Sequence, residues 1–223
     1  IFTLREKWEA FLKKKTSTLT EDYLSEKYPL HKEEDNILIN SRVFPNKTLI
    51  KELAQLKPNQ TLVSGDLLIA HRLRAQDIDN LELELLDAVE PMETKAELTS
   101  LNCLMDIINL NGQAIRDDFA LITHGRKSQP LPSQVQVHAP ENVFVEEGAS
   151  FGFCTINASE GPVYIGMNAN VMDGAMLRGP LSLGEGSIIR MGARVYGNTS
   201  IGPNCKISGE ITTSVVFGNS NKP

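Results

Sequence analysis

The sequence predicts a mixed α/β domain followed by a parallel β-helix built from six-residue repeats. Three observations support this fold class. Of the 16 glycines, only Gly65, Gly112 and Gly125 precede residue 145, and 39 of the 50 charged residues lie in positions 1–144. Aliphatic residues then recur at every sixth position from 165 to 207. We therefore expect an α/β domain over 1–125, a polar, proline-containing linker over 126–140 and a β-helix over 141–223.

The beginning of the α/β domain contains two helix signals and one strand signal. Leu4, Trp8, Phe11 and Leu12 have helical spacing and predict an amphipathic helix in which Trp8 anchors the core. Thr18 and Glu21 have the spacing of a capping box, which predicts a short helix after them. The apolar run within 36–40 predicts a short buried strand.

The rest of this domain predicts further helices and a hairpin. A helix is expected over 47–55, ended by Pro58, and the polar turn 64–66 between apolar runs predicts a β-hairpin. Thr94 and Glu97 form a second capping-box pattern. The helical stripe expected after it consists of Leu98, Leu101, Met105 and Ile108.

The six-residue period is the strongest signal in the sequence. Eight aliphatic residues follow it without a gap: Ile165, Val171, Leu177, Leu183, Ile189, Val195, Ile201 and Ile207. Small residues mostly stand two positions before the next aliphatic one, with Leu181 and Ile211 as exceptions. A chain that turns a corner at each repeat and points one aliphatic side chain inward per segment closes a three-sided coil with every third repeat. A β-sandwich is the weaker alternative, because it requires apolar alternation and longer turns.

Residues that are three repeats apart should therefore lie on the same face of neighbouring coils. Gly166, Gly184 and Gly202 support this, and on another face we expect Arg178, Tyr196 and Ser214 to be equivalent. The segment 157–164 carries two extra positions and predicts a looped coil, and about four coils are expected in all.

Composition excludes several classes of protein and site. A net charge of −6 without a basic tract argues against nucleic acid or an anionic membrane as partner. No segment approaches the about 18 apolar residues of a membrane span. The three cysteines, Cys103, Cys154 and Cys205, predict neither a disulfide framework nor a metal site. The start lacks an initiator methionine and a secretory pattern, so we expect a cytoplasmic protein represented by a truncated chain.

The repeat region resembles the hexapeptide-repeat transferases, whose fold is a left-handed parallel β-helix. Several segments are similar to a narrower group, the Bacteroidetes-type sugar nucleotidyltransferase-like proteins named as glucose-1-phosphate thymidylyltransferases. These segments are 161–166, 177–180, 191–197, 208–211 and 217–222. That group is similar to the bifunctional N-acetylglucosamine-1-phosphate uridyltransferase/glucosamine-1-phosphate acetyltransferase. The resemblance extends through the first domain, including 2–8 and 67–70.

The resemblance implies an enzyme of nucleotide-sugar metabolism. The first domain would be a sugar-1-phosphate nucleotidyltransferase that uses an NTP and Mg²⁺. The β-helix would transfer an acyl group from acetyl-CoA or another acyl-CoA to an amino sugar phosphate, at a groove between subunits of a homotrimer. The competing hypothesis is a non-catalytic trimeric scaffold or sugar-nucleotide-binding protein with degenerate sites. The sequence does not identify the nucleotide, the sugar or the acyl group.

Five residues of the β-helix are the predicted substrate-binding residues, because bidentate arginines can clamp the phosphate of a sugar phosphate or of CoA. They are Arg178, Arg190, Arg194, Tyr196 and Lys206. Arg178 and Tyr196 should stack on one face, and Lys206 should lie above Ile188 and Asn170. An ion-pair ladder with Asp173, Glu185 and Glu210 at a trimer interface is an equally open alternative.

The catalytic residues remain unassigned. Acyl transfer in the family uses a histidine base, but His31, His71, His124 and His138 all precede the repeats. His124 is expected in a loop and His138 in the linker, both as solvated side chains. In relatives a histidine follows the segment equivalent to 220–222, so the base is expected beyond residue 223.

The sequence also contains few residues that could be assigned to nucleotidyl transfer. A glycine-rich loop that would hold nucleotide phosphates is absent, since the first glycine is Gly65. The loop lies upstream of Ile1 or the domain lacks it. Asp66 and Asp106 are the best-placed carboxylates for Mg²⁺, but a solvated role is favoured for both, and no metal ligands are assigned.

Overall fold

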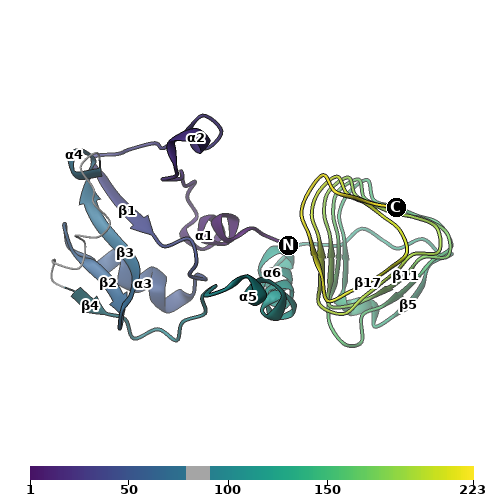
Figure 1. Ribbon diagram of the computed structural model, residues 1–223. Coiled ribbons are helices and arrows are strands. Elements are labelled where there is room, and N and C mark those ends of the chain that lie inside the picture. Colours follow the sequence, from purple (N-terminus) through teal and green to yellow (C-terminus); the bar gives the residue numbers. More distant parts are fainter. Residues whose placement is uncertain (79–90) are drawn as a thin grey trace. The chain divides into compact units, whose positions relative to one another are not determined.

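The computed structural model describes residues 1–78 and 91–223, and within it the chain separates into two compact units. One unit spans Phe2–Asn102, and the other spans Cys103–Pro223 together with Ile1. Figure 1 shows the mixed α/β elements of the first and the three-sided coils of the second. The composition change over 126–140 therefore lies inside the second unit, after the two helices that open it.

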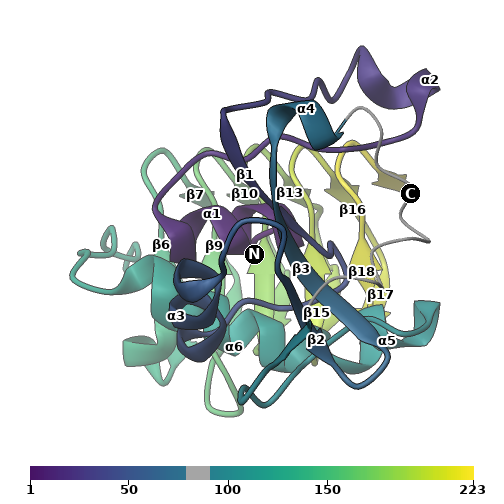
Figure 2. The ribbon, with the colours of Figure 1, turned by 90° about the vertical axis from the view of Figure 1, so that its left-hand side faces the viewer.

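The first unit contains a four-stranded sheet with the order β1-β3-β2-β4. Its strands are β1 (Asp35–Ile39), β2 (Thr61–Ser64), β3 (Leu67–Arg74) and β4 (Pro91–Glu93). β3 pairs antiparallel with β1 and β2, as Figure 2 shows, and β4 runs parallel to β2. The predicted hairpin is confirmed, and Gly65 takes a φ of +52° in its turn. The strand predicted over 36–40 is confirmed as β1, but this edge strand is half-exposed rather than buried.

The helices of this unit are α1 (Leu4–Leu12), α2 (Asp22–Ser25), α3 (Lys47–Gln55) and α4 (Ala75–Ile78). α1 and α3 form where the apolar spacing predicts them. Trp8 is 4% exposed, and its indole Nε1 donates a hydrogen bond to the Val43 carbonyl at 2.9 Å. Leu49 and Leu53 of α3 join the same core. Trp8 is thus confirmed as a core anchor.

Both predicted capping boxes are wrong. α2 begins after Glu21 without a side-chain cap, whereas Thr3 and Glu6 form a capping box at the start of α1. The Thr94 hydroxyl instead donates to the Glu52 carboxylate of α3, and the backbone that follows is extended, with Ser100 bridging Val43. Tertiary partners thus hold the segment after Thr94 in an extended form.

The second unit is a parallel β-helix with three five-stranded sheets. The groove sheet contains β5 (Gln136–His138), β8 (Thr155–Asn157), β11 (Met176–Arg178), β14 (Arg194–Tyr196) and β17 (Glu210–Thr212). The helix-covered sheet contains β6 (Val143–Val145), β9 (Val163–Ile165), β12 (Leu181–Leu183), β15 (Thr199–Ile201) and β18 (Val215–Val216). The third sheet contains β7 (Ser150–Phe151), β10 (Asn170–Val171), β13 (Ile188–Ile189), β16 (Lys206–Ile207) and β19 (Asn221–Lys222).

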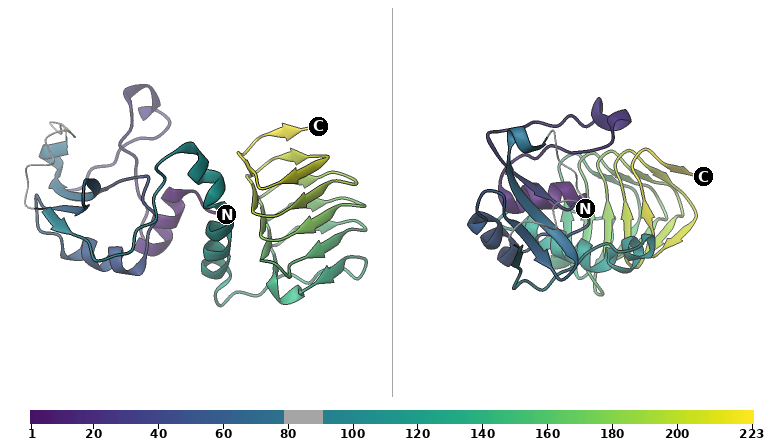
Figure 3. Two further views of the ribbon diagram at one scale, coloured as in Figure 1. Left: turned by 60° about the horizontal axis from the view of Figure 1, so that its bottom comes forward. Right: turned by 60° about the vertical axis from the view of Figure 1, so that its left-hand side comes forward.

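Figure 3 shows the strands of successive coils stacked in parallel. The eight aliphatic residues of the six-residue period are each at most 2% exposed, and the small residues Ala169, Ala175 and Ala193 are fully buried beside them. Each coil thus places its aliphatic side chains in one continuous core. The predicted β-helix is confirmed.

The coils are not all of equal length. Leu183 pairs with Ile165 across one regular coil, and Ile165 pairs with Val145 across a longer one, which confirms the predicted looped coil. Val195 pairs with Ile211 across a shorter coil, so Thr212 and not Ser214 lies beside Tyr196. The extra or missing residues lie in the loops between the strands, so the strands of neighbouring coils still pair in register. Five strands per sheet correspond to about five coils rather than the four expected.

Two helices precede the β-helix and belong to the same unit, α5 (Leu104–Asn109) and α6 (Asn111–Thr123). The predicted stripe that runs from Leu98 to Ile108 is therefore not one helix, since α5 begins only at Leu104. α6 contacts β12 and β15. Asn111 donates to the Asn198 carbonyl at 2.6 Å and accepts from the Ser200 hydroxyl at 2.7 Å. α6 thus covers the outer side of one of the three sheets.

A charged and aromatic cluster fixes the chain after α6 to the same sheet. Arg126 makes two hydrogen bonds to the Glu146 carboxylate, at 2.8 and 2.6 Å, and Tyr164 donates to that carboxylate at 2.8 Å. The Arg126 guanidinium also lies 5.1 Å from the ring centroid of Phe144. Burial would raise the pKa of Glu146, but Arg126 and Tyr164 outweigh it and hold the pKa below its ordinary value.

No helix among residues 1–78 and 91–223 has the length and apolar character needed to cross a membrane. The cytoplasmic location stays a prediction.

Replacing Arg126 with methionine should lower the free energy of unfolding of the second unit by about 1–2 kcal/mol, because Glu146 loses its charged partner while half-buried. The folded-state pKa of Glu146 is lowered, so this stabilisation is present above the pKa of an unfolded glutamate. It is lost as the pH falls through the lower folded-state value. Thermal unfolding followed by circular dichroism at neutral and acid pH measures both effects. Lys127→Met, at an exposed neighbour, is the control, and equal melting of the two variants would contradict the role of the cluster.

The first unit should lose stability as the pH falls below the pKa of an unfolded histidine. His71 is 4% exposed, its Nδ1 lies 2.9 Å from the Thr61 hydroxyl, and burial lowers its pKa. The unfolded chain therefore binds a proton more readily than the folded one between the two pKa values. His71→Gln should flatten this dependence in urea unfolding followed by Trp8 fluorescence, whereas His31→Gln should not. Parallel pH profiles for wild type and His71→Gln would refute the assignment.

Candidate functional site

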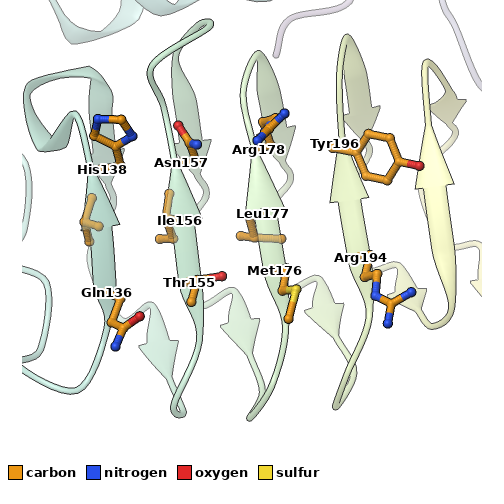
Figure 4. Close-up of a pocket in the computed structure, with 11 residues that line it drawn as sticks. Gln136, His138, Thr155, Ile156, Asn157, Met176, Leu177, Arg178, Arg194 and Tyr196 are labelled. Atoms are coloured by element: carbon orange, nitrogen blue, oxygen red, sulfur yellow. The ribbon is translucent and has the colours of Figure 1, made fainter.

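The outer face of the groove sheet carries an open groove of about 640 Å³ that crosses β5, β8, β11 and β14 (Figure 4). Strand alternation explains which side chains reach it. Ile156, Leu177 and Val195 stand at the centre of their strands and point into the core, so the residues on either side of each point outward. The groove is therefore a direct consequence of the repeat.

The outward residues form two rows, one residue per coil in each. The first row contains Gln136, Thr155, Met176 and Arg194, and the second contains His138, Asn157, Arg178 and Tyr196. Glu210 and Thr212 of β17 stand beside Arg194 and Tyr196 and continue both rows.

Arginine–carboxylate pairs occur on this face. Arg178 lies 3.4 Å from the Glu160 carboxylate, and Arg194 lies 3.5 Å from that of Glu210. The Tyr196 hydroxyl donates to Glu210 at 2.5 Å, and this hydrogen bond raises the pKa of the phenol. Tyr196 therefore remains a protonated donor at neutral pH.

The β5 and β8 end of the groove has a different chemical character. Gln136, His138, Thr155 and Asn157 offer amide, imidazole and hydroxyl groups there. Asn157 Oδ1 accepts hydrogen bonds from the backbone and hydroxyl of Ser159, at 3.0 and 2.7 Å, which fixes its orientation. This end can bind the hydroxyl groups of a sugar, and the imidazole can exchange a proton with a bound ligand.

The structure brings together three of the five predicted substrate-binding residues. Arg178, Arg194 and Tyr196 line the groove. Arg190 follows β13, and Lys206 begins β16 in the third sheet, so these two lie on a different side of the β-helix. Lys206 does stand beside Ile188, and Ile188 beside Asn170, as predicted.

His138 is the site residue that the sequence interpretation missed. It lies in β5, not in an unstructured linker, and pairs with Asn157 in the row that contains Arg178. The coils that lead from His138 to Asn157 and from Asn157 to Arg178 are both longer than three repeats, so a strict period does not reach His138. Val137, half-buried against the core, was the available signal for an additional coil.

Three carboxylates were expected in an ion-pair ladder at a trimer interface, and within one chain they have different partners. Glu210 pairs with Arg194 within the chain, whereas Asp173 accepts a hydrogen bond from the Phe153 backbone at 2.9 Å. For the described residues, Asp173 and Glu185 form no ion pair with an arginine.

The two carboxylates considered for Mg²⁺ lie in different units of the chain. Asp66 is exposed in the hairpin turn of the first unit, whereas Asp106 accepts a hydrogen bond from the Cys103 backbone in the second. Within 1–78 and 91–223, no three His, Cys, Asp or Glu side chains gather where they could hold a metal ion.

Comparison with known proteins identifies the first part of the chain. A family model described as sugar nucleotidyl transferase matches residues 1–127, which is more than half of the 223 residues. The matched region includes the first unit and both helices that precede the β-helix. A search of curated proteins finds no match. Because the family model covers most of the chain, the protein belongs to the sugar nucleotidyl transferase family.

Proposed function

We propose that this protein is a transferase of nucleotide-sugar metabolism, with a sugar-1-phosphate nucleotidyltransferase region followed by an acyl-CoA-dependent acyltransferase. Family membership supports the first activity. The groove supports the second, and it is the observation that carries the proposal. Its ligand would be an amino sugar phosphate whose amine attacks the thioester carbonyl of an acyl-CoA and releases CoA.

The groove has the side chains that this reaction requires. Arg178 and Arg194 each use one guanidinium nitrogen on a carboxylate, at 3.4 and 3.5 Å, and retain further donors for a phosphate. His138 supplies a group that can accept the proton lost by the attacking amine. Asn157 and Thr155 offer hydrogen bonds to sugar hydroxyls between these two ends.

In a homotrimer, the predicted site residues of the groove could lie beside Arg190 and Lys206 of a neighbouring subunit. The helix-covered sheet has α6 on its outer side, so the groove sheet and the third sheet are the faces available for a second copy. In a homotrimer the third sheet of one subunit can face the groove of its neighbour. Arg190 and Lys206 would then approach Arg178 and Arg194 of the adjacent subunit.

A non-catalytic scaffold is the second candidate. One observation favours it, because Arg178 and Arg194 both pair with carboxylates of their own chain. Such pairs can serve to hold the coils in register without binding a ligand.

The two candidates differ in activity. The full-length protein should release CoA from an acyl-CoA with an amino sugar phosphate, and pyrophosphate from an NTP with a sugar 1-phosphate.

Arg178→Gln should raise the KM for the amino sugar phosphate about tenfold, which corresponds to about 1.4 kcal/mol, and His138→Asn should lower kcat. Both variants should leave pyrophosphate release unchanged, and Arg74→Gln in the first unit is the matched control for CoA release. Silence in both assays would refute the enzyme and favour the scaffold.

Sedimentation equilibrium at micromolar concentration should give the mass of a trimer. Ile188→Glu, in β13 of the third sheet, should weaken association, because the new carboxylate would have to be desolvated on the face proposed to meet a neighbouring groove. Glu141→Lys, an exposed charge reversal near β6, is the control. A wild-type monomer would rule out the shared site.

A further inference from the structure

The looped coil of the β-helix contains a loop between β8 and β9, residues 158–162, which we call the β8–β9 loop. Its two ends are fixed by backbone hydrogen bonds. Ala158 is fully buried, and its N–H donates to the His138 carbonyl at 3.0 Å. At the other end, the Pro162 carbonyl accepts a hydrogen bond from the Leu181 N–H at 2.9 Å. The loop is thus tied to the coils on either side of it.

The middle of the β8–β9 loop contacts two side chains of the groove. The backbone and hydroxyl of Ser159 donate to Asn157 Oδ1, at 3.0 and 2.7 Å. The Glu160 carboxylate lies 3.4 Å from the Arg178 guanidinium. Asn157 and Arg178 are neighbours in the second row of the groove, as Figure 4 shows. One loop therefore contacts two adjacent groove residues.

The pair of Glu160 and Arg178 does not fix its own geometry. The two side chains are 63% and 50% exposed. An ion pair between exposed side chains contributes little and leaves both partners free to move. The orientation of Arg178 therefore depends on the contact that fixes the backbone of Glu160.

Arg116 of α6 makes that contact. Its Nη2 donates to the Glu160 carbonyl at 2.9 Å, and a hydrogen bond from a charged donor is stronger than one from a neutral donor. Gly161 provides the space, because a Cβ at this position would collide with the Arg116 guanidinium and with Pro180. Since α6 contacts β12 and β15, Arg116 connects Glu160 to the helix-covered sheet.

We propose that Arg116 is a positioning residue that orients Arg178 for the phosphate of the ligand, through Glu160 and the β8–β9 loop. An arginine that is oriented before binding loses less side-chain freedom when the phosphate arrives, so the affinity is higher. The inference rests on the proposed phosphate-binding role of Arg178. It gives α6, a helix of the region that the family model matches, a role in the groove.

Calorimetry of the full-length protein with glucosamine 1-phosphate and glucosamine 6-phosphate tests the proposal. Arg116→Met should weaken binding of whichever phosphate binds more tightly by about threefold, because Arg178 then has to be ordered on binding. Arg116→Lys keeps a charged donor and should restore part of this loss. Gln113→Met is the matched control on the same helix. The Gln113 amide donates to Asp117 of α6, so this variant should leave binding unchanged.

A double-mutant cycle distinguishes an effect through Arg178 from a general loss of structure. Arg178→Gln alone should weaken binding about tenfold. Adding Arg116→Met to it should weaken binding no further, because the side chain that Arg116 orients is gone, whereas independent effects would give about thirtyfold. In the CoA-release assay, Arg116→Met should raise KM and leave kcat unchanged, since the pairing of β5 with β8 holds His138.

The outcomes separate this inference from the proposed function. Unchanged or tighter binding to Arg116→Met, with weaker binding to Arg178→Gln, would overturn the role of Arg116 alone. Independent effects in the double variant would also overturn it. Failure of the wild type to bind either phosphate would refute the proposed function together with this inference. Circular dichroism of each variant confirms that the β-helix is folded.

Discussion

The fold of the second unit depends on one constraint. Each repeat must bury one aliphatic side chain in a shared core. Residues such as Ile165, Leu183 and Ile201 are buried at successive levels of the stack. Once they face inward, their neighbours on each short strand must face outward. The groove sheet therefore has aligned rows of outward side chains, and these side chains can vary without changing the core. The same requirement positions Arg178 and Tyr196 side by side.

Among the described residues, α6 covers the outer side of one of the three sheets of the β-helix. α6 contacts β12 and β15, and the cluster of Arg126, Glu146 and Tyr164 extends this attachment to β6 and β9. The region matched by the family model thus ends in elements that pack on the β-helix. This arrangement joins the family region to the repeat.

Each of the two groove arginines, Arg178 and Arg194, is balanced by a carboxylate of the same chain. A strip of unpaired arginines would attract any phosphate, whereas arginines paired with Glu160 and Glu210 bind an anion only by sharing or releasing a carboxylate. The paired arrangement is also compatible with a purely structural role in which the pairs keep adjacent coils aligned.

The sequence determined the features that depend on local pattern: α1, α3, the hairpin at Gly65 and the regular coils from Ile165 to Ile207. It did not determine the extended segment after Thr94, because Glu52 and Val43, distant in sequence, hold it. It also did not place His138 in the groove. The physical reason is that loops of unequal length join the coils, so spacing along the chain shifts while the strands remain aligned. Beyond the regular coils, only the stacked tertiary structure shows which outward side chains share a face.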